Sequence, residues 1–243
     1  MINPLIKASD LAFSYRADNG DIDVLKNINV RVEKGSFLSI IGPSGCGKTS
    51  LLRLIAGLEK PTYGSIEVGS QNSAYVFQQP ALFPWATVSA NIEKPMKLSN
   101  AHNIAQKTAQ VLEQVGLSEF ADKYPHQLSG GMQHRVSIAR ALAMQPDLLL
   151  MDEPFGALDE QTRENMNLEL WELWKATNKT ICFVTHSIAE AVFLSTDILV
   201  LSSRPGEVKA IFKTALPKER TPETFTSQAF NDQVTEVRKV MRD

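Results

Sequence analysis

The stretch from Gly42 to Ser50, Gly-Pro-Ser-Gly-Cys-Gly-Lys-Thr-Ser, constrains the fold more than any other part of the sequence. It matches the phosphate-loop pattern, in which a glycine-rich turn joins a strand to a helix. The apolar run Phe37 to Ile41 before it predicts a buried strand, and the run Leu51 to Leu58 after it predicts a helix. Because both flanks are present, the sequence favours a nucleotide-phosphate site over a plain glycine turn.

Each residue type in this loop has its own reason to bind phosphate. Glycines let backbone N–H groups approach phosphate oxygens without a Cβ in the way. The helix that begins near Lys48 adds its positive dipole end, Lys48 can reach the β- and γ-phosphates, and the Thr49 hydroxyl can ligate Mg²⁺. The predicted nucleotide-binding residues of the loop are Gly42, Pro43, Ser44, Gly45, Cys46, Gly47, Lys48, Thr49 and Ser50.

Composition sets the class of protein. The 243 residues, of which 43% are hydrophobic, can build one large α/β domain or two small ones, and a net charge of −2 argues against a general polyanion-binding surface. Two cysteines, Cys46 and Cys182, predict free thiols in a reducing compartment. The segment Met1 to Asp10 lacks the pattern of a signal peptide, and no apolar run reaches the ~20 residues of a membrane-spanning helix. We therefore expect a cytoplasmic chain that reaches any membrane through a partner.

The segment before the phosphate loop predicts an antiparallel sheet. From Leu5 to Val32 apolar residues alternate loosely, and Asp18, Asn19 and Gly20 form a turn between the two halves. Tyr15 is then either an ordinary strand aromatic, which the sequence alone favours, or a platform that stacks on a nucleobase.

Two short strands, 65–68 and 74–77, follow the phosphate-loop helix. Gln78 comes directly after the second strand, where its amide oxygen either ligates Mg²⁺ or simply faces solvent. The next segment, Ala81 to Asn91, predicts a loop that is too apolar for solvent, so it is either core or a docking surface.

A helix over Ala101 to Val115 precedes the sequence Leu-Ser-Gly-Gly-Met-Gln, residues 128–133, which stands before another helix. Ser129 is either a plain helix cap, or it forms a second phosphate-binding surface with the glycine amides and the helix N-terminus.

Two further strands end in polar residues. The buried run Leu148 to Met151 ends in Asp152 and Glu153, and ligands of parallel sheets bind at the carboxyl ends of strands. There Asp152 can hold Mg²⁺ and Glu153 can polarise the attacking water, the alternative being a solvated strand end. The strand Thr180 to Val184 ends beside His186, which is either structural or a hydrogen-bonding partner of a γ-phosphate.

The remaining pattern predicts an amphipathic helix over 162–174, a helix over 188–194, and strands over 197–201 and 208–212. From Thr214 onward the chain is more polar, and we expect a peripheral extension that ends in a short helix.

Taken together and in this order, the motifs resemble the ATP-binding subunit of ABC transporters up to about residue 213. In that resemblance residues 128–133 are the LSGGQ-like sequence, Gln78 is the glutamine loop, Ala157-Leu158-Asp159 is the D-loop and His186 is the switch histidine. It implies an α/β P-loop NTPase with a mainly parallel core sheet, an N-terminal antiparallel β subdomain and a helical subdomain at about 80–145. The cassette would span 1–213, and 214–243 would be a short C-terminal extension.

The resemblance also implies how such a chain works. Two copies pair head to tail, each ATP lying between one phosphate loop and the other chain's LSGGMQ, and closure drives a membrane permease that docks on Phe83 and Trp85. A periplasmic or lipoprotein substrate-binding protein is an indirect partner, and nucleic acid is not a partner. The implied catalytic residues are Glu153, His186, Lys48 and Gln78. The further implied nucleotide contacts are Tyr15, Ser129, Gly130, Gly131 and Gln133. The implied metal ligands are Thr49, Gln78 and Asp152.

A finer resemblance is to the importers of nitrate, sulfonates, taurine and related small molecules such as pyrimidine precursors. It is carried by Phe77 to Pro80, Leu82 to Trp85, the Arg204-Pro205-Gly206 turn and the short tail. The alternatives are a soluble ABC ATPase of DNA repair, iron-sulfur assembly or ribosomes, and the ATPase of an exporter. The chain has neither the coiled-coil insertion of DNA-repair members nor the tandem cassettes of ribosomal ones.

Overall fold

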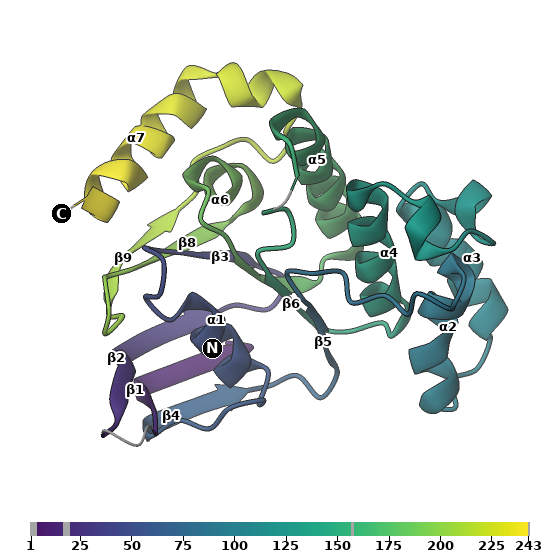
Figure 1. Ribbon diagram of the computed structural model, residues 1–243. Helices are drawn as coiled ribbons and strands as arrows, with labels where there is room; N and C mark the ends of the chain where they lie inside the picture. The colour runs from purple at the N-terminus through teal and green to yellow at the C-terminus, as the bar shows by residue number, and fades with distance from the viewer. Residues whose placement is uncertain (1–3, 17–19, 157, 243) are drawn as a thin grey trace.

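The computed structural model describes residues 4–16, 20–156 and 158–242, and its strands form two sheets (Figure 1). One has three strands in the order β2-β1-β4, and the other has six in the order β5-β6-β7-β3-β8-β9. The strands are β1 (Ile6–Tyr15), β2 (Ile22–Val32), β3 (Phe37–Ile41), β4 (Tyr63–Val68), β5 (Ser73–Val76), β6 (Leu148–Asp152), β7 (Thr180–Val184), β8 (Asp197–Leu201) and β9 (Val208–Lys213). The helices are α1 (Lys48–Ile55), α2 (Val88–Leu98), α3 (Ile104–Gln114), α4 (Gly130–Ala143), α5 (Glu160–Thr177), α6 (Ile188–Leu194) and α7 (Gln228–Arg242).

The six-stranded sheet is parallel except for β9, which pairs antiparallel with β8. Strands β3 and β7 are buried along their whole length, as expected for a sheet covered on both faces. Register aligns β6 with β7 through the pair Asp152 and Val184, and β7 with β3 through Val184 and Ile40. The carboxyl ends of these three strands therefore lie together, which confirms the predicted mainly parallel core.

The three-stranded sheet is antiparallel, as predicted, with β1 between β2 and β4. On β1 the buried residues are Ile6, Ala8, Leu11 and Phe13. The buried positions change from even to odd numbers where the pairing with β2 is irregular, around Asp10. Two residues of the predicted turn, Asp18 and Asn19, lie outside the described residues.

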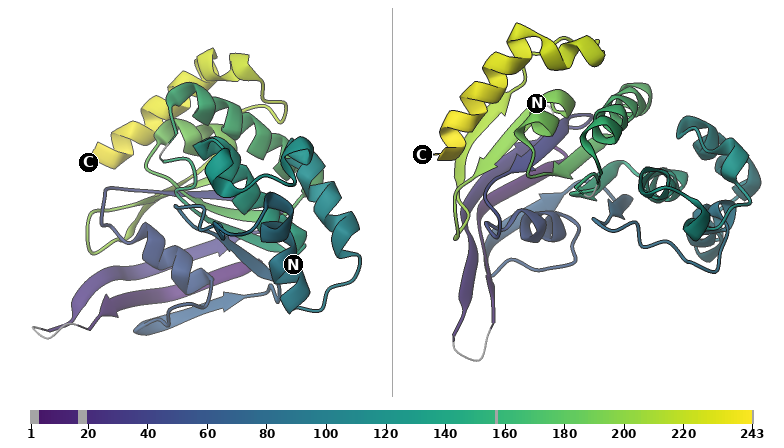
Figure 2. Two further views of the ribbon diagram at one scale, coloured as in Figure 1. Left: turned by 45° about the vertical axis from the view of Figure 1, so that its right-hand side comes forward. Right: turned by 45° about the horizontal axis from the view of Figure 1, so that its top comes forward.

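Helices α2, α3 and α4 gather to one side of the six-stranded sheet (Figures 1 and 2). The prediction that 81–91 is entirely loop was wrong, because α2 begins at Val88 with the Thr87 hydroxyl accepting a hydrogen bond from Ala90 N. Pro95 lies inside α2 and hides the helical pattern, since proline normally breaks a helix interior. Even so, Val88, Ile92 and Met96 form one buried stripe.

Three other predicted helices have different bounds in the structure. Helix α1 ends at Ile55 instead of Leu58 because Gly57 has a left-handed backbone, and α3 begins three residues later than predicted. Helix α5 is longer than predicted, since Asp159 caps its start by accepting from Thr162 N and it continues to Thr177.

The C-terminal segment is more firmly attached than the predicted peripheral extension. Helix α7 has 15 residues and lies along the outside of α6, β8 and β9 (Figure 1). Leu216, Phe230 and Val237 nevertheless belong to the main buried core. The buried Arg220 donates to the carbonyls of Phe193 and Ser195 at the end of α6.

Among the described residues, no helix has both the length and the apolarity that crossing a membrane requires.

If α7 stabilises the core, truncating its buried face must be costly. Phe230 is only 5% exposed and packs edge-on against Phe225. We expect Phe230→Ala to lower the free energy of unfolding by about 3 kcal/mol, measured by urea denaturation. The exposed Thr235 of the same helix provides the control, since Thr235→Ala should change it by less than about 0.5 kcal/mol. Equal effects of the two substitutions would mean that α7 does not share the core.

Candidate active site

The phosphate loop connects β3 to α1 and leaves the start of α1 open to a ligand. Gly47 precedes the helix with a left-handed backbone, φ 102°, and a Cβ there would come within 2.7 Å of Leu25 Cδ2. The helix begins at Lys48, so the N–H groups of its first turn have no partner within the helix. This geometry suits an anion.

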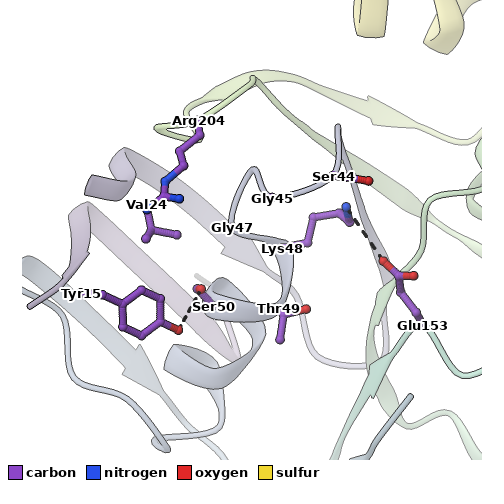
Figure 3. A pocket seen from close by; sticks show the side chains of 10 residues that line it. All are labelled: Tyr15, Val24, Ser44, Gly45, Gly47, Lys48, Thr49, Ser50, Glu153 and Arg204. Carbon is purple, nitrogen blue, oxygen red and sulfur yellow. Dashed lines mark hydrogen bonds and ion pairs between the residues drawn. The ribbon is translucent and has the colours of Figure 1, made fainter. Parts of the chain in front are cut away.

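A pocket of about 290 Å³ lies over this loop (Figure 3). It contains most of the predicted loop residues, while Gly42, Pro43 and Cys46 support the loop without lining the pocket. The lining residues are Tyr15, Val24, Ser44, Gly45, Gly47, Lys48, Thr49, Ser50, Glu153 and Arg204.

Lys48 is held within the loop that it serves. Its side chain is buried, and Nζ donates to the carbonyls of Gly42 at 3.1 Å and Pro43 at 3.2 Å. The ammonium is also 4.0 Å from Glu153 Oε1 (Figure 3). A fixed positive charge thus stands at the pocket, with a carboxylate beside it.

The end of β6 meets the start of α1 through oxygen ligands. Thr49 Oγ1 donates to Asp152 Oδ1 at 2.9 Å, and Tyr75 donates to Asp152 Oδ2 at 3.1 Å. Burial, followed by the neighbouring Asp152 carboxylate, raises the pKa of Tyr75, which keeps the phenol protonated as a donor. A hydroxyl and a carboxylate at this distance fit the oxygen chemistry of Mg²⁺. Gln78 is exposed, and within the described ranges no hydrogen bond joins it to either group.

Glu153 and His186 come from neighbouring strand ends. Glu153 has a left-handed backbone, φ 44°, and its N–H donates to the Val184 carbonyl of β7. Glu153 Oε2 lies 3.0 Å from His186 Nδ1. One carboxylate therefore stands between the ammonium of Lys48 and the imidazole of His186.

A network of side chains beside Glu153 and His186 was not predicted from the sequence. Glu190 accepts a hydrogen bond from the Thr185 hydroxyl and lies 3.5 Å from Arg163 Nε. Arg163 also donates to the carbonyl of Leu158, in the predicted D-loop, whose Ala157 lies outside the described residues. Burial raises the pKa of Glu190, although Thr185 and Arg163 oppose that rise. The network links the D-loop to the strand end that carries the histidine.

Tyr15 lies at the edge of the pocket, at the end opposite Lys48 (Figure 3). Its hydroxyl is 3.4 Å from Ser50 Oγ, and its ring packs edge-on against Phe13. The side chain keeps 38% of its surface exposed. Tyr15 therefore lines the pocket from its edge, and its role as a nucleobase platform stays a prediction.

The LSGGMQ sequence does not reach the pocket of its own chain. Ser129 Oγ accepts from Met132 N at 3.3 Å, which makes it the N-cap of α4, and Gly130 is exposed. Gln133 donates to the carbonyls of Pro125 and Leu128. Ser129, Gly130, Gly131 and Gln133 are not among the residues that line the pocket. Within one chain, the start of α4 therefore lies outside the pocket of the phosphate loop.

Sequence reasoning assigned no site role to Val24 or Arg204, which also line the pocket. Val24 belongs to β2, and Arg204 lies in the turn between β8 and β9. In the sequence Val24 is one apolar residue of a predicted strand, and Arg204 is a cation before a proline-glycine turn. Neither pattern by itself indicates a nucleotide contact.

A phosphate loop at the carboxyl edge of a mainly parallel sheet defines the P-loop nucleoside triphosphatases. Within that class, the chain belongs to the ABC transporter family, whose sequence model matches residues 25–156. It is an ATP-binding subunit of that family and an ATPase.

Relatives match over most of the chain. The nitrate import ATP-binding protein NrtD of Synechocystis sp. is 44% identical over 231 residues, 91% of this chain and 87% of the relative. The aliphatic sulfonates import ATP-binding protein SsuB of Bacillus cereus is 38% identical over 236 residues, 94% of each. The dimeric structure of MJ0796, a bacterial ABC transporter cassette, is 34% identical with a TM-score of 0.76, covering 87% of this chain and 100% of that one.

The two thiols should be inert in the folded protein. Cys46 and Cys182 are both 0% exposed. Burial raises the pKa of Cys46 and raises that of Cys182 to about 12, so neither forms a thiolate readily. We expect no reaction with a chromogenic disulfide at pH 8 in the native state and reaction of both thiols in guanidinium chloride. Rapid native reaction of Cys46 would show that the phosphate loop opens.

Proposed function

We propose that the chain works as one of two paired ATPase subunits that power import of a small molecule through a membrane permease. The separation of the phosphate loop from the start of α4 carries this proposal. The phosphate loop lines a pocket, while Ser129 and Gly130 are exposed at the start of α4 outside it. A helix N-terminus with glycine amides suits a γ-phosphate presented by a second copy.

In the proposed site the residues bind, orient or stabilise different parts of the nucleotide and the attacking water. Lys48 and the loop amides bind the phosphates, and Tyr15 stacks on the base. Glu153 orients the water for in-line attack, and His186 hydrogen-bonds the γ-phosphate and holds Glu153. Thr49 and Asp152 would hold Mg²⁺, which supplies charge stabilisation at the transferred phosphoryl group. Gln78 remains a proposed third ligand.

A second surface supports docking of a permease. A pocket of about 330 Å³ lies between β5, α2 and α4, and Phe83, Lys94, Leu98 and Arg140 are among its lining residues. Trp85 next to it is 70% exposed, which is a large apolar surface in water. Arg140 donates to the carbonyls of Pro80 and Ala81, so α4 holds the segment that follows Gln78.

We propose Phe83 and Trp85 as anchors for a permease helix inserted at this surface. Lys94 Nζ lies 4.1 Å from the centre of the Phe83 ring, which leaves Trp85 as the more accessible of the two. The segment from Gln79 to Asn91 would then connect this surface to Gln78 and the nucleotide site.

The names of the relatives suggest the cargo. NrtD is named for nitrate import and SsuB for import of aliphatic sulfonates, so we propose nitrate, a sulfonate, taurine or a related compound. The subunit would lie peripherally on the cytoplasmic face of the inner membrane, and a substrate-binding protein would act through the permease. The proposed cassette is 1–213, with a helical subdomain at about 80–145 and an extension at 214–243.

Replacing the proposed water-orienting carboxylate should separate pairing from hydrolysis. We expect Glu153→Gln to form a stable dimer with ATP, seen by size-exclusion chromatography, and to lose at least ~100-fold in turnover. Lys48→Ala is the control, because loss of the phosphate ligand should prevent both ATP binding and dimerisation. Full hydrolysis by Glu153→Gln would refute the role of this carboxylate.

Transport itself tests the proposed function. Deleting the gene should abolish uptake of one labelled compound among nitrate, taurine, alkanesulfonates and a pyrimidine precursor, and the wild-type gene should restore it. We expect Trp85→Glu to fail in this rescue while the isolated subunit keeps its ATPase activity. Tyr63→Glu is the matched control, since Tyr63 is an equally exposed aromatic, at 73%, on β4. Unchanged uptake of every compound would favour an exporter or a non-transport ATPase.

A further inference from the structure

Arg204 has a place in the nucleotide pocket that no sequence motif assigns to it. In the described part of the chain, Lys48 and Arg204 are the cationic side chains that line this pocket. Figure 3 shows Lys48 toward one end, Tyr15 toward the other, and Arg204 on a third side above Val24.

The turn that carries Arg204 is fastened to β2 by hydrogen bonds. Arg204 Nε donates to the carbonyl of Asp23 at 2.9 Å. Gly206 N donates to the Val24 carbonyl at 2.8 Å, and Lys26 N donates to the Gly206 carbonyl at 3.0 Å. The turn thereby extends the pairing of β2 and holds the guanidinium next to Val24.

The same turn also lies against the phosphate loop. A Cβ added to Gly206 would meet the Cys46 carbonyl at 2.2 Å, so only glycine allows this approach. The position of Arg204 is therefore fixed by contacts of its turn with both the phosphate loop and β2.

The charge of Arg204 has no carboxylate partner in the described ranges. Asp23 accepts from the Ser14 hydroxyl through its side chain and offers Arg204 only its carbonyl. Nε is used by that bond, and the two terminal nitrogens form no hydrogen bond within the same ranges. An exposed guanidinium with two available NH2 groups, beside a phosphate site, suits an anionic or hydroxyl-bearing ligand.

We propose that Arg204 binds the nucleotide between the base and the β-phosphate, at the ribose and α-phosphate, and so raises affinity for ADP and ATP alike. A nucleotide with its base at Tyr15 and its terminal phosphates at Lys48 would lie in the pocket that Val24 and Arg204 line from a third side. The inference rests on the proposed nucleotide site and adds a binding residue to it.

The test is ADP affinity, because ADP needs neither hydrolysis nor pairing. We expect Arg204→Ala to weaken ADP binding, by isothermal titration calorimetry with Mg²⁺, roughly five- to tenfold. KM for ATP should rise by a similar factor with kcat unchanged. The ADP affinity of Arg204→Lys should lie between that of Arg204→Ala and that of the wild type. Lys26→Ala is the matched control, since Lys26 is a nearby cation on β2 outside the pocket, and should bind ADP as wild type does.

The salt dependence of ADP affinity and the melting temperature distinguish a direct contact of Arg204 with the nucleotide from a purely structural role. If Arg204 touches the nucleotide, ADP affinity of the wild type falls more steeply with KCl than that of Arg204→Ala, and the melting temperature without nucleotide is unchanged. A lower melting temperature with an unchanged salt dependence would overturn the proposal. So would wild-type ADP affinity in Arg204→Ala when Lys48→Ala has lost binding. Wild-type affinity in Lys48→Ala would instead overturn the nucleotide site itself.

Discussion

The parallel register of β3, β7 and β6 determines where the chemistry can occur. Ladder hydrogen bonds continue past the strands, since Thr185 N donates to the Ile40 carbonyl and Glu153 N donates to the Val184 carbonyl. Backbone pairing thus sets the relative positions of the phosphate loop, the carboxylates and the histidine before any side chain interacts. Strands of a parallel sheet carry their ligand groups at the carboxyl edge for this reason.

Charges at this edge are arranged to receive an anion. Lys48 is buried, yet its ammonium is satisfied by two carbonyls of its own loop and a carboxylate at 4.0 Å. A buried charge without such partners would be costly, so the loop keeps the cation in place without a ligand. The start of α4 lies outside the pocket, and in the proposed pair it would contribute its dipole only when a second chain approaches. Hydrolysis would then depend on assembly rather than on a moving catalytic residue.

Sequence reasoning was most successful for short buried elements that are bounded by polar residues. The bounds of β3, β7, α6 and β8 agree with the predictions because buried runs between polar ends leave little choice. Helix α2 was missed because Pro95 has a low helix propensity. Packing of α2 against α4 overrides that local preference. Arg204 was missed for another reason, since its hydrogen bond to Asp23 joins residues 181 positions apart. Gln78 stays a prediction, because in the described part of the chain no hydrogen bond joins it to Thr49 or Asp152.

The hairpin β8–β9 connects the nucleotide pocket to the C-terminal segment. Its turn is held by β2 through Gly206, and its strands contact α7, where Lys209 Nζ is 3.5 Å from the Val240 carbonyl. Strand β9 is the antiparallel edge of the sheet, so apart from β8 its position depends on these two attachments. Helix α7 therefore packs on the two strands whose connecting turn carries Arg204. The C-terminal segment is thereby connected to the pocket through the hairpin, although none of its described residues lines the pocket.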